Sequence, residues 1–292
     1  MHKAGFVNII GSPNVGKSTL MNELVGERLS IITSKAQTTR HRIVGIVNEP
    51  EYQIVFSDTP GVLRPSYKLH ESMMGFVGTA LKDADVLLLM VEPRERSLNN
   101  PEVLERIKKS SIPLILLINK MDQSNNAQLD EAFDFWKNEL PRAIITPVSA
   151  LHKFNIDFVK NKIVELLPES PPYYGKEELT DRPVRFFVTE TIREKILLHY
   201  DKEIPYSCEV VVESYTEEPE IDRISVVIYV ERDSQKGILI GKGGNDIKRV
   251  GTEARKDLEK FLQKKVFMEI FVKVDKDWRN EESKLKKYGY NS

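Results

Sequence analysis

A glycine-rich segment close to the amino terminus has the composition and spacing of a phosphate-binding loop. Residues 11–18 read G-S-P-N-V-G-K-S, which fits the pattern G-x-x-x-x-G-K-[ST]. The segment follows a β-branched run and precedes a helical segment, which is the context that this pattern requires. We therefore expect the loop amides and the helix amino terminus to face phosphate oxygens, Lys17 to reach the terminal phosphates, and Ser18 to bind Mg²⁺.

Two further motifs follow later strand-like runs. Residues 58–61 read D-T-P-G, in which Asp58 would hold Mg²⁺ through water and the Gly61 amide would contact the terminal phosphate. Residues 119–122 read N-K-M-D, and the Asp122 carboxylate can accept hydrogen bonds from the ring and exocyclic N–H groups of guanine. Adenine would leave that carboxylate unpaired at a cost of roughly 1–3 kcal/mol. The three motifs together favour a guanine nucleotide over an incidental glycine turn or a P-loop kinase.

The order and spacing of these motifs resemble those of the translation-factor-related GTPases. Residues 148–150 read V-S-A and match the last guanine-contacting loop of that family. The resemblance implies that the Ala150 amide contacts the guanine carbonyl. The residues expected to bind the nucleotide are Gly11, Ser12, Pro13, Asn14, Val15, Gly16, Lys17, Ser18, Thr19, Asp58, Thr59, Pro60, Gly61, Asn119, Lys120, Asp122, Ser149 and Ala150.

A polar stretch at 35–42 lies between the first two motifs. The resemblance implies that a threonine here closes over Mg²⁺ only when the γ-phosphate is present. We expect Thr39, with Thr38 as the alternative, to join Ser18 and Asp58 as the metal ligands. A solvated loop whose threonines only cap backbone groups is the competing interpretation. Lys17, Thr39 and Gly61 are the residues expected to act in catalysis.

Position 62 departs from the pattern of many GTPases, which place a glutamine directly after the glycine of D-x-x-G. This chain has Val62, which cannot orient the attacking water, so intrinsic hydrolysis should be slow unless backbone groups, a cation or a partner order that water. Asn14 favours K⁺ as such a cation, because GTPases with the same loop sequence use this asparagine to help bind K⁺. Arg40 and Arg42 are candidates for internal arginine fingers or for ordinary surface side chains.

An α/β fold is predicted to position these residues. Short apolar runs at 6–10, 43–48, 53–57, 86–91, 114–118 and 144–148 alternate with helical segments. This alternation predicts a P-loop GTPase domain with a mostly parallel, doubly wound sheet, whose strands carry the motifs at their carboxyl ends, where such sheets bind ligands. Three prolines and a glycine within 168–175 end the pattern. We expect a first domain at 1–168, a linker at 169–182 and a second domain at 183–292.

The second half carries a different glycine-rich turn. Residues 240–248 read I-G-K-G-G-N-D-I-K within a predicted α-β-β-α-α-β order. A G-x-x-G turn lets an RNA backbone approach closely, although taken alone it could be an ordinary helical turn. In this order it resembles an α+β type II KH domain. The RNA-contacting residues expected are Ile240, Gly241, Lys242, Gly243, Gly244, Ile247, Lys248 and Arg249, with bases lying on Ile240 and Ile247.

The two domains together resemble the Era family of bacterial ribosome-assembly GTPases. The resemblance covers essentially the whole chain, and strings such as K-A-Q-T-T-R-H-R-I at 35–43 and G-T-E-A-R-K-D at 251–257 are specific to the family. It implies GTP or GDP with Mg²⁺, binding to the 3′ end of small-subunit (16S) ribosomal RNA, and a role in 30S subunit maturation. It also implies a cytoplasmic protein with peripheral association with the inner membrane, and we expect a monomer. The competing interpretation is a nucleotide-binding adaptor that engages a protein or the membrane surface through the second domain.

Composition supports a cytoplasmic protein and localises the charge. The single cysteine excludes an internal disulfide, the five histidines are scattered, and no apolar run approaches the roughly 20 residues of a membrane span.

The formal net charge of −1 argues against a generally basic nucleic-acid binder. However, 201–233 carries ten acidic and three basic residues, whereas 236–273 carries ten basic and five acidic residues. The basic segment contains the G-x-x-G turn, so RNA binding would be local. The aromatic tail at 278–290 could extend that surface, but we favour its packing on the domain.

Overall fold

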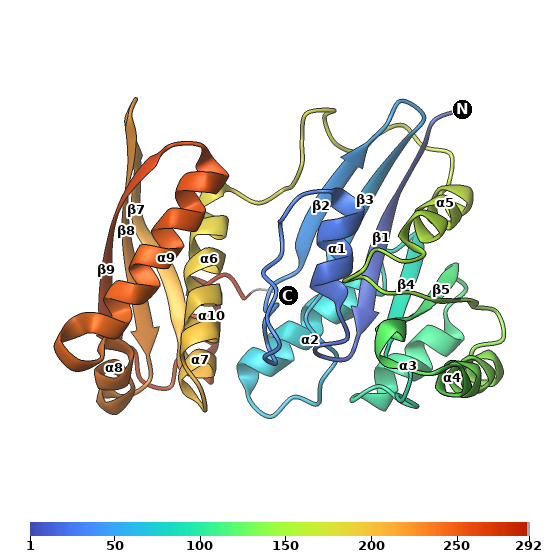
Figure 1. Ribbon diagram of the computed structural model, residues 1–292, viewed down its shortest axis with the longest axis horizontal. Helices are drawn as coiled ribbons and strands as arrows, with labels where there is room; N and C mark the ends of the chain where they lie inside the picture. The colour runs from blue at the N-terminus through green and yellow to red at the C-terminus, as the bar shows by residue number, and fades with distance from the viewer. Residues whose placement is uncertain (291–292) are drawn as a thin grey trace. The chain divides into compact units, whose positions relative to one another are not determined.

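The computed structural model describes residues 1–290, which separate into two compact units. The main division lies between Asp181 and Arg182, and residues 67–69 group with the second unit. The first unit contains one six-stranded sheet with α-helices on both faces (Figure 1). Its elements are β1 (Lys3–Gly11), α1 (Lys17–Val25), β2 (Ile43–Asn48), β3 (Tyr52–Asp58), α2 (Lys68–Ala80), β4 (Val86–Val91), α3 (Pro101–Lys109), β5 (Leu114–Ile118), η1 (Met121–Gln123), α4 (Asn126–Glu139), β6 (Ile144–Pro147) and α5 (Ile156–Leu166).

The strand order is β2-β3-β1-β4-β5-β6. β2 runs antiparallel to β3, and the other neighbouring strands are parallel. β4 and β5 are buried along their whole length, because α1 and α5 cover one face of the sheet while α2, α3 and α4 cover the other. The mostly parallel, doubly wound sheet predicted from the sequence is confirmed. The three nucleotide motifs follow β1, β3 and β5, so they meet at the same edge of this sheet.

The segment expected to be a linker is fastened to the first unit up to Asp181. It contains no helix or strand, as its prolines predict, but the buried Gln53 side chain accepts hydrogen bonds from the amides of Tyr173 (2.7 Å) and Tyr174 (3.1 Å). Farther along, the Ile46 amide donates to Leu179 O at 2.8 Å. A buried amide side chain needs such partners, so the segment follows β3 and β2 rather than extending freely.

The second unit is a three-stranded sheet covered by helices on one face (Figure 1). β8 lies in the centre, antiparallel to β7 and parallel to β9, and α6 and α9 contact each other and the sheet. The order confirms the predicted KH fold, with two short helices, α7 and α10, added. Its elements are α6 (Val184–His199), α7 (Ile204–Ser207), β7 (Glu209–Glu217), β8 (Ile221–Val230), α8 (Asp233–Ile240), η2 (Lys242–Gly244), α9 (Asn245–Leu262), β9 (Lys265–Val274) and α10 (Glu282–Lys287).

The aromatic tail packs on the second unit. Trp278 is fully buried and its indole N–H donates to Ser207 O at 3.0 Å. The Tyr288 ring meets the Trp278 ring edge to face at 5.7 Å, and the Tyr290 hydroxyl donates to Glu209 at 2.7 Å. The tail therefore belongs to the core of this unit, which agrees with the interpretation favoured from the sequence.

Candidate functional site

The phosphate-binding segment forms a loop between β1 and α1 with a buried lysine at its centre. Asn14 (φ 65°) and Gly16 (φ 103°) take the left-handed conformation, which turns the chain around the loop. A Cβ on Gly16 would lie 2.3 Å from Asn119 Nδ2, so no larger residue fits there. Lys17 Nζ donates to Gly11 O (3.1 Å) and Ser12 O (2.9 Å). Burial lowers the pKa of Lys17 to about 8, although the neighbouring carboxylates of Asp58 and Glu95 oppose this effect.

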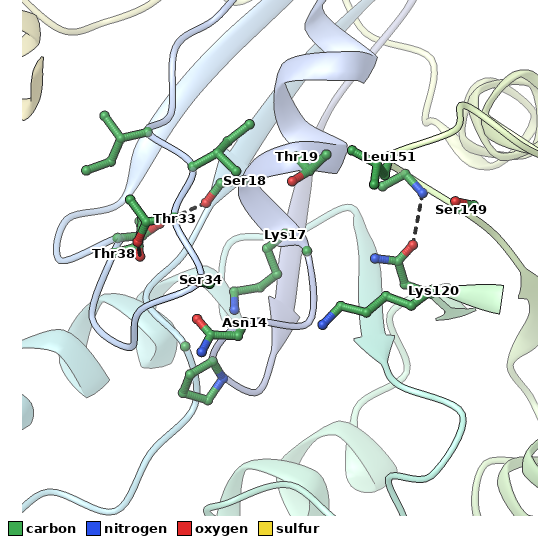
Figure 2. Close-up of a pocket in the computed structure, with 18 of the residues that line it drawn as sticks. Asn14, Lys17, Ser18, Thr19, Thr33, Ser34, Thr38, Lys120, Ser149 and Leu151 are labelled. Carbon is green, nitrogen blue, oxygen red and sulfur yellow. Dashed lines mark hydrogen bonds between the residues drawn. The ribbon is translucent and has the colours of Figure 1, made fainter. Parts of the chain in front are cut away.

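The loop opens into a cavity of about 340 Å³. Figure 2 shows Lys17 and Asn14 in this pocket, with Thr38 on one side and Lys120 on the other. Of the residues expected to bind the nucleotide, those that line the cavity are Pro13, Asn14, Gly16, Lys17, Ser18, Thr19, Gly61, Asn119, Lys120, Asp122, Ser149 and Ala150, and the expected metal ligand Thr39 lines it too.

Three of the other expected residues direct their side chains elsewhere. The Ser12 hydroxyl donates to Glu95, Val15 packs in the core, and the Thr59 hydroxyl donates to Ile9 O at 2.7 Å. These three residues do not line the cavity, and neither do Gly11, Asp58 and Pro60. Val62 is also fully buried and packs in the core, so the position where many GTPases carry glutamine does not face the cavity.

Three oxygen-bearing side chains gather beside Lys17. Ser18 Oγ lies 2.7 Å from Asp58 Oδ2 and 3.0 Å from Thr39 Oγ1, and Thr39 Oγ1 lies 3.2 Å from the same carboxylate oxygen. Burial raises the pKa of Asp58, while Lys17 and the hydroxyls oppose the rise. Among the described residues, Asp58 Oδ1 is buried without a hydrogen-bond partner. Mg²⁺ prefers oxygen ligands, and a carboxylate oxygen that has no hydrogen-bond partner can serve as one, so this cluster fits Mg²⁺.

The structure distinguishes the two candidate threonines. Thr39 is buried next to Ser18 and Asp58. The Thr38 hydroxyl instead lies 2.6 Å from Thr33 Oγ1 and donates to Lys35 O at 2.6 Å. In this arrangement Thr39 is the one placed to bind a metal ion, while Thr38 stabilises the loop.

Asn119 joins the loops that surround the cavity. Its Nδ2 donates to Val15 O at 2.7 Å, and its Oδ1 accepts from the Ala150 amide at 2.9 Å. Asp122 Oδ1 accepts from the Ser149 hydroxyl at 2.6 Å, and this hydrogen bond lowers the pKa of Asp122. The carboxylate is therefore ionised at neutral pH, as pairing with guanine N–H groups requires.

Sequence reasoning missed some residues of this cavity. Residues 31–34, Gln123 and Leu151 line it but belong to none of the short motifs, and Gln37 lines it from the polar stretch at 35–42, where only the threonines were expected to act. Glu92 and Glu95, in the loop after β4, contact Lys120 and Ser12, and no sequence pattern marked them. These contacts arise from the sheet topology and not from local spacing.

The G-x-x-G segment of the second unit forms an exposed turn between α8 and α9. Gly241, Gly243 and Gly244 all have positive φ values, between 63° and 78°. A Cβ on Gly243 or Gly244 would meet no atom within 4 Å, so the outer side of the turn is open to a ligand backbone. Lys242 is exposed at its tip.

A shallow cavity of about 250 Å³ follows this turn, between α9 and β9. Its wall combines apolar and basic side chains, which suits unstacked bases and phosphates. Of the residues predicted to contact RNA, Ile247 and Lys248 line it, whereas Ile240, Lys242 and Arg249 do not. The lining residues are Ile247, Lys248, Gly251, Thr252, Arg255, Met268 and Ile270.

Comparison with known proteins gives the same two domains. Residues 6–120 match the family described as 50S ribosome-binding GTPase, and residues 203–279 match the KH domain family. The chain is 42% identical over 292 residues to GTPase Era of Alkaliphilus metalliredigens, covering 99% of both proteins. It is 44% identical to the chloroplastic GTPase ERA-like protein of Oryza sativa, covering 99% of this chain and 70% of that protein. A crystal structure of Era in complex with MgGDPNP and nucleotides 1506–1542 of 16S ribosomal RNA superposes with a TM-score of 0.95 at 37% identity, covering 100% of both chains.

Proposed function

Because this chain belongs to the Era family of GTPases, we propose that it is a GTP-hydrolysing switch that binds the 3′ end of 16S ribosomal RNA during 30S subunit assembly. The observation that carries the proposal is the convergence of Lys17, Ser18, Thr39 and Asp122 on one cavity, with the buried Asp58 carboxylate hydrogen-bonded to Ser18 and Thr39. The similar Era structure, solved with MgGDPNP and 16S ribosomal RNA, supports both ligands.

Different residues at or next to the cavity would bind the metal ion, the phosphates and the base of GTP. Ser18, Thr39 and Asp58 would hold Mg²⁺, directly or through water, and the ion would neutralise charge on the phosphates. Lys17 leaves its two carbonyl partners and stabilises charge that develops on the transferring phosphoryl group. The Gly61 amide lies at the same cavity, where it would contact the γ-phosphate. Asp122 selects guanine, and Asn119 holds the base loop against the phosphate loop.

We propose slow intrinsic hydrolysis, because the buried Val62 cannot orient water. K⁺ is our candidate activator, since Asn14 lines the cavity in a left-handed conformation beside Lys17. GTP turnover that is equal in KCl and NaCl, at constant Mg²⁺, would contradict a role for K⁺.

The second unit would bind the RNA through the G-x-x-G turn and the cavity between α9 and β9. Lys242 and Lys248 supply positive charge, and Ile247 offers an apolar surface for a base. As functional domains we propose residues 1–168 for the nucleotide, 169–182 as the connection and 183–292 for RNA. Within residues 1–290, no helix has both the length and the apolar character that crossing a bilayer needs. Cytoplasmic location, peripheral association with the inner membrane and a monomeric state stay predictions.

Gly243 allows a matched test of RNA binding. Its φ of 63° is tolerated by Asp and Asn, and its surroundings are open, so Gly243→Asp and Gly243→Asn should both fold. We expect the Asp variant to bind a 16S 3′-end oligonucleotide at least tenfold more weakly than the isosteric Asn variant in the presence of GTP, because a carboxylate repels the RNA phosphates.

Crosslinking in cells tests the physiological partner. The wild-type protein, crosslinked with GTP present, should carry small-subunit 3′-end RNA, and Gly243→Asp should lose it. Absence of that RNA from the wild-type sample, or equal recovery with Gly243→Asp, would favour an adaptor that binds a protein or membrane surface instead.

A further inference from the structure

Four residues outside every motif, Glu92–Glu95, form a tight turn directly after β4. The Glu95 amide donates to Glu92 O at 3.0 Å, and the Glu92 amide donates back to Glu95 Oε2 at 3.2 Å. The next residue, Arg96, donates to Pro93 O at 2.7 Å, and its guanidinium lies 5.4 Å from the centroid of the Phe135 ring on α4. The turn is therefore fixed both internally and against the domain.

The two carboxylates of this turn lie against the loops that form the nucleotide cavity. Glu92 forms an ion pair with Lys120, and Glu95 Oε1 accepts from the Ser12 hydroxyl. The charge of Glu95 also acts on Lys17, where it opposes the effect of burial on the pKa of the lysine. Burial raises the pKa of Glu95, while the hydrogen bonds that its two carboxylate oxygens accept from the Ser12 hydroxyl and the Glu92 amide oppose the rise and favour the ionised form.

Glu95 does not line the cavity, so it acts from behind the phosphate loop. In the empty site its negative charge favours the charged form of Lys17. When the phosphates of a nucleotide arrive, the same charge repels them across a partly buried region, where screening by water is weaker than at an open surface. The Glu95 carboxylate and the nucleotide phosphates therefore both interact with the positive charge of Lys17, and each weakens the interaction of the other.

We propose that Glu95 is a positioning residue that lowers the affinity of the phosphate loop for guanine nucleotides, acting through Lys17 and Ser12. The inference rests on the proposed GTP-binding function and deepens it, because a weakened site releases GDP quickly without an exchange factor. Since the charge acts on the phosphates and not on the base, it lowers the affinity for both GDP and GTP.

Glu95→Gln tests this role, because it keeps the size of the side chain and removes the charge. We expect GDP to bind about fivefold to tenfold more tightly, mainly through slower release, which is the size of effect expected of one partly screened charge. The KM for GTP should fall severalfold while kcat stays within about twofold, and the gain in affinity should shrink as NaCl is raised from about 0.05 to 0.5 M. Stopped-flow measurements with a fluorescent GDP analogue on the full chain give the association and release rates.

Two control variants separate the charge from the hydrogen bond and from net charge. Ser12→Ala keeps the Glu95 charge but removes the hydroxyl, so nucleotide should bind no more tightly than to the wild type. Glu165→Gln makes the same change in net charge on the exposed face of α5, where the backbone of residue 165 meets Lys3 at the opposite end of β1 from the phosphate loop, and should leave the affinity unchanged.

Unchanged or weaker nucleotide binding by Glu95→Gln would overturn the inference. An equal gain of affinity in Ser12→Ala or in Glu165→Gln would also overturn it, because the effect would then come from the hydrogen bond or from net charge. A wild-type protein that binds neither GDP nor GTP would overturn the proposed function as well, whereas normal wild-type binding with an unaltered Glu95→Gln variant would overturn the inference alone.

Discussion

Asn119 offers a direct test of how the nucleotide cavity is held together. Its side chain satisfies Val15 O at 2.7 Å and the Ala150 amide at 2.9 Å, and all three residues are buried. Asn119→Ala leaves both backbone groups without that partner, at about 1–3 kcal/mol each. The adjoining cavity admits water, which can replace part of each bond, so we expect a loss of about 2–3 kcal/mol in the free energy of unfolding of the first unit. At about 2–4 °C per kcal/mol for a unit of this size, the melting temperature should fall by about 4–12 °C without nucleotide.

Tryptophan fluorescence can follow the two units separately, because the chain has two tryptophans and one is buried in each unit. A Trp278→Phe background leaves Trp136 as the reporter of the first unit. Asn125→Ala is a matched control in that unit, since it removes an asparagine that caps α4 and should cost only about 1 kcal/mol. If Asn119→Ala unfolds no earlier than Asn125→Ala, yet binds GDP at least tenfold more weakly, Asn119 acts by contacting the ligand and the bridging role is wrong.

Three further outcomes follow from the geometry. Asp122→Asn replaces an acceptor by an amide, so GTP should bind more weakly by about 1–3 kcal/mol while xanthosine triphosphate gains, which competition binding measures. Burial lowers the pKa of Lys17 to about 8, so without nucleotide the lysine loses its proton above that pH, whereas bound phosphates favour the charged form. GDP affinity measured from pH 7 to 8.8 should therefore stay constant at first and then fall, approaching tenfold per pH unit. An affinity that does not change over this range would contradict the burial of a titrating lysine. Trp278→Ala empties a fully buried site and should destabilise the second unit by about 3–5 kcal/mol in chemical denaturation, whereas a change under 1 kcal/mol would contradict a core role for the tail.

The sequence predicted the elements that local patterns encode. The apolar runs at 86–91 and 114–118 are strands with the same bounds in the structure. They could be predicted because a parallel strand that is buried on both faces is a short, continuous run of large apolar residues. The G-K-S and N-K-x-D residues meet at one edge of the sheet for the same reason, since each follows such a strand. Such a motif specifies both the functional side chains and the local turn that positions them, so both can be predicted from the sequence.

Contacts between distant segments could not be read in this way. Nothing in the sequence around Gln53 indicates that its side chain binds the amides of residues 173 and 174, which are 120 and 121 positions later. The choice between Thr38 and Thr39 also depends on how the loop folds back on Ser18, which places only the second of two adjacent threonines against Asp58. Helix α7, only four residues long, lacks the periodicity that identifies a helix in a sequence.

The burial of Val62 changes what its identity means. In the sequence, Val62 stands where many GTPases have a glutamine, which suggests that a valine-to-glutamine substitution would restore the group that orients water. In the structure its side chain is fully buried with Ile10 and Leu89, and its amide donates to Gly11 O at 2.9 Å. A glutamine at this position would either bury an amide or displace the backbone that supports the phosphate loop. A water-orienting group must therefore come from another part of the cavity, from a cation or from a partner. The packing that supports the phosphate loop is thus the physical basis of our prediction that unassisted hydrolysis is slow.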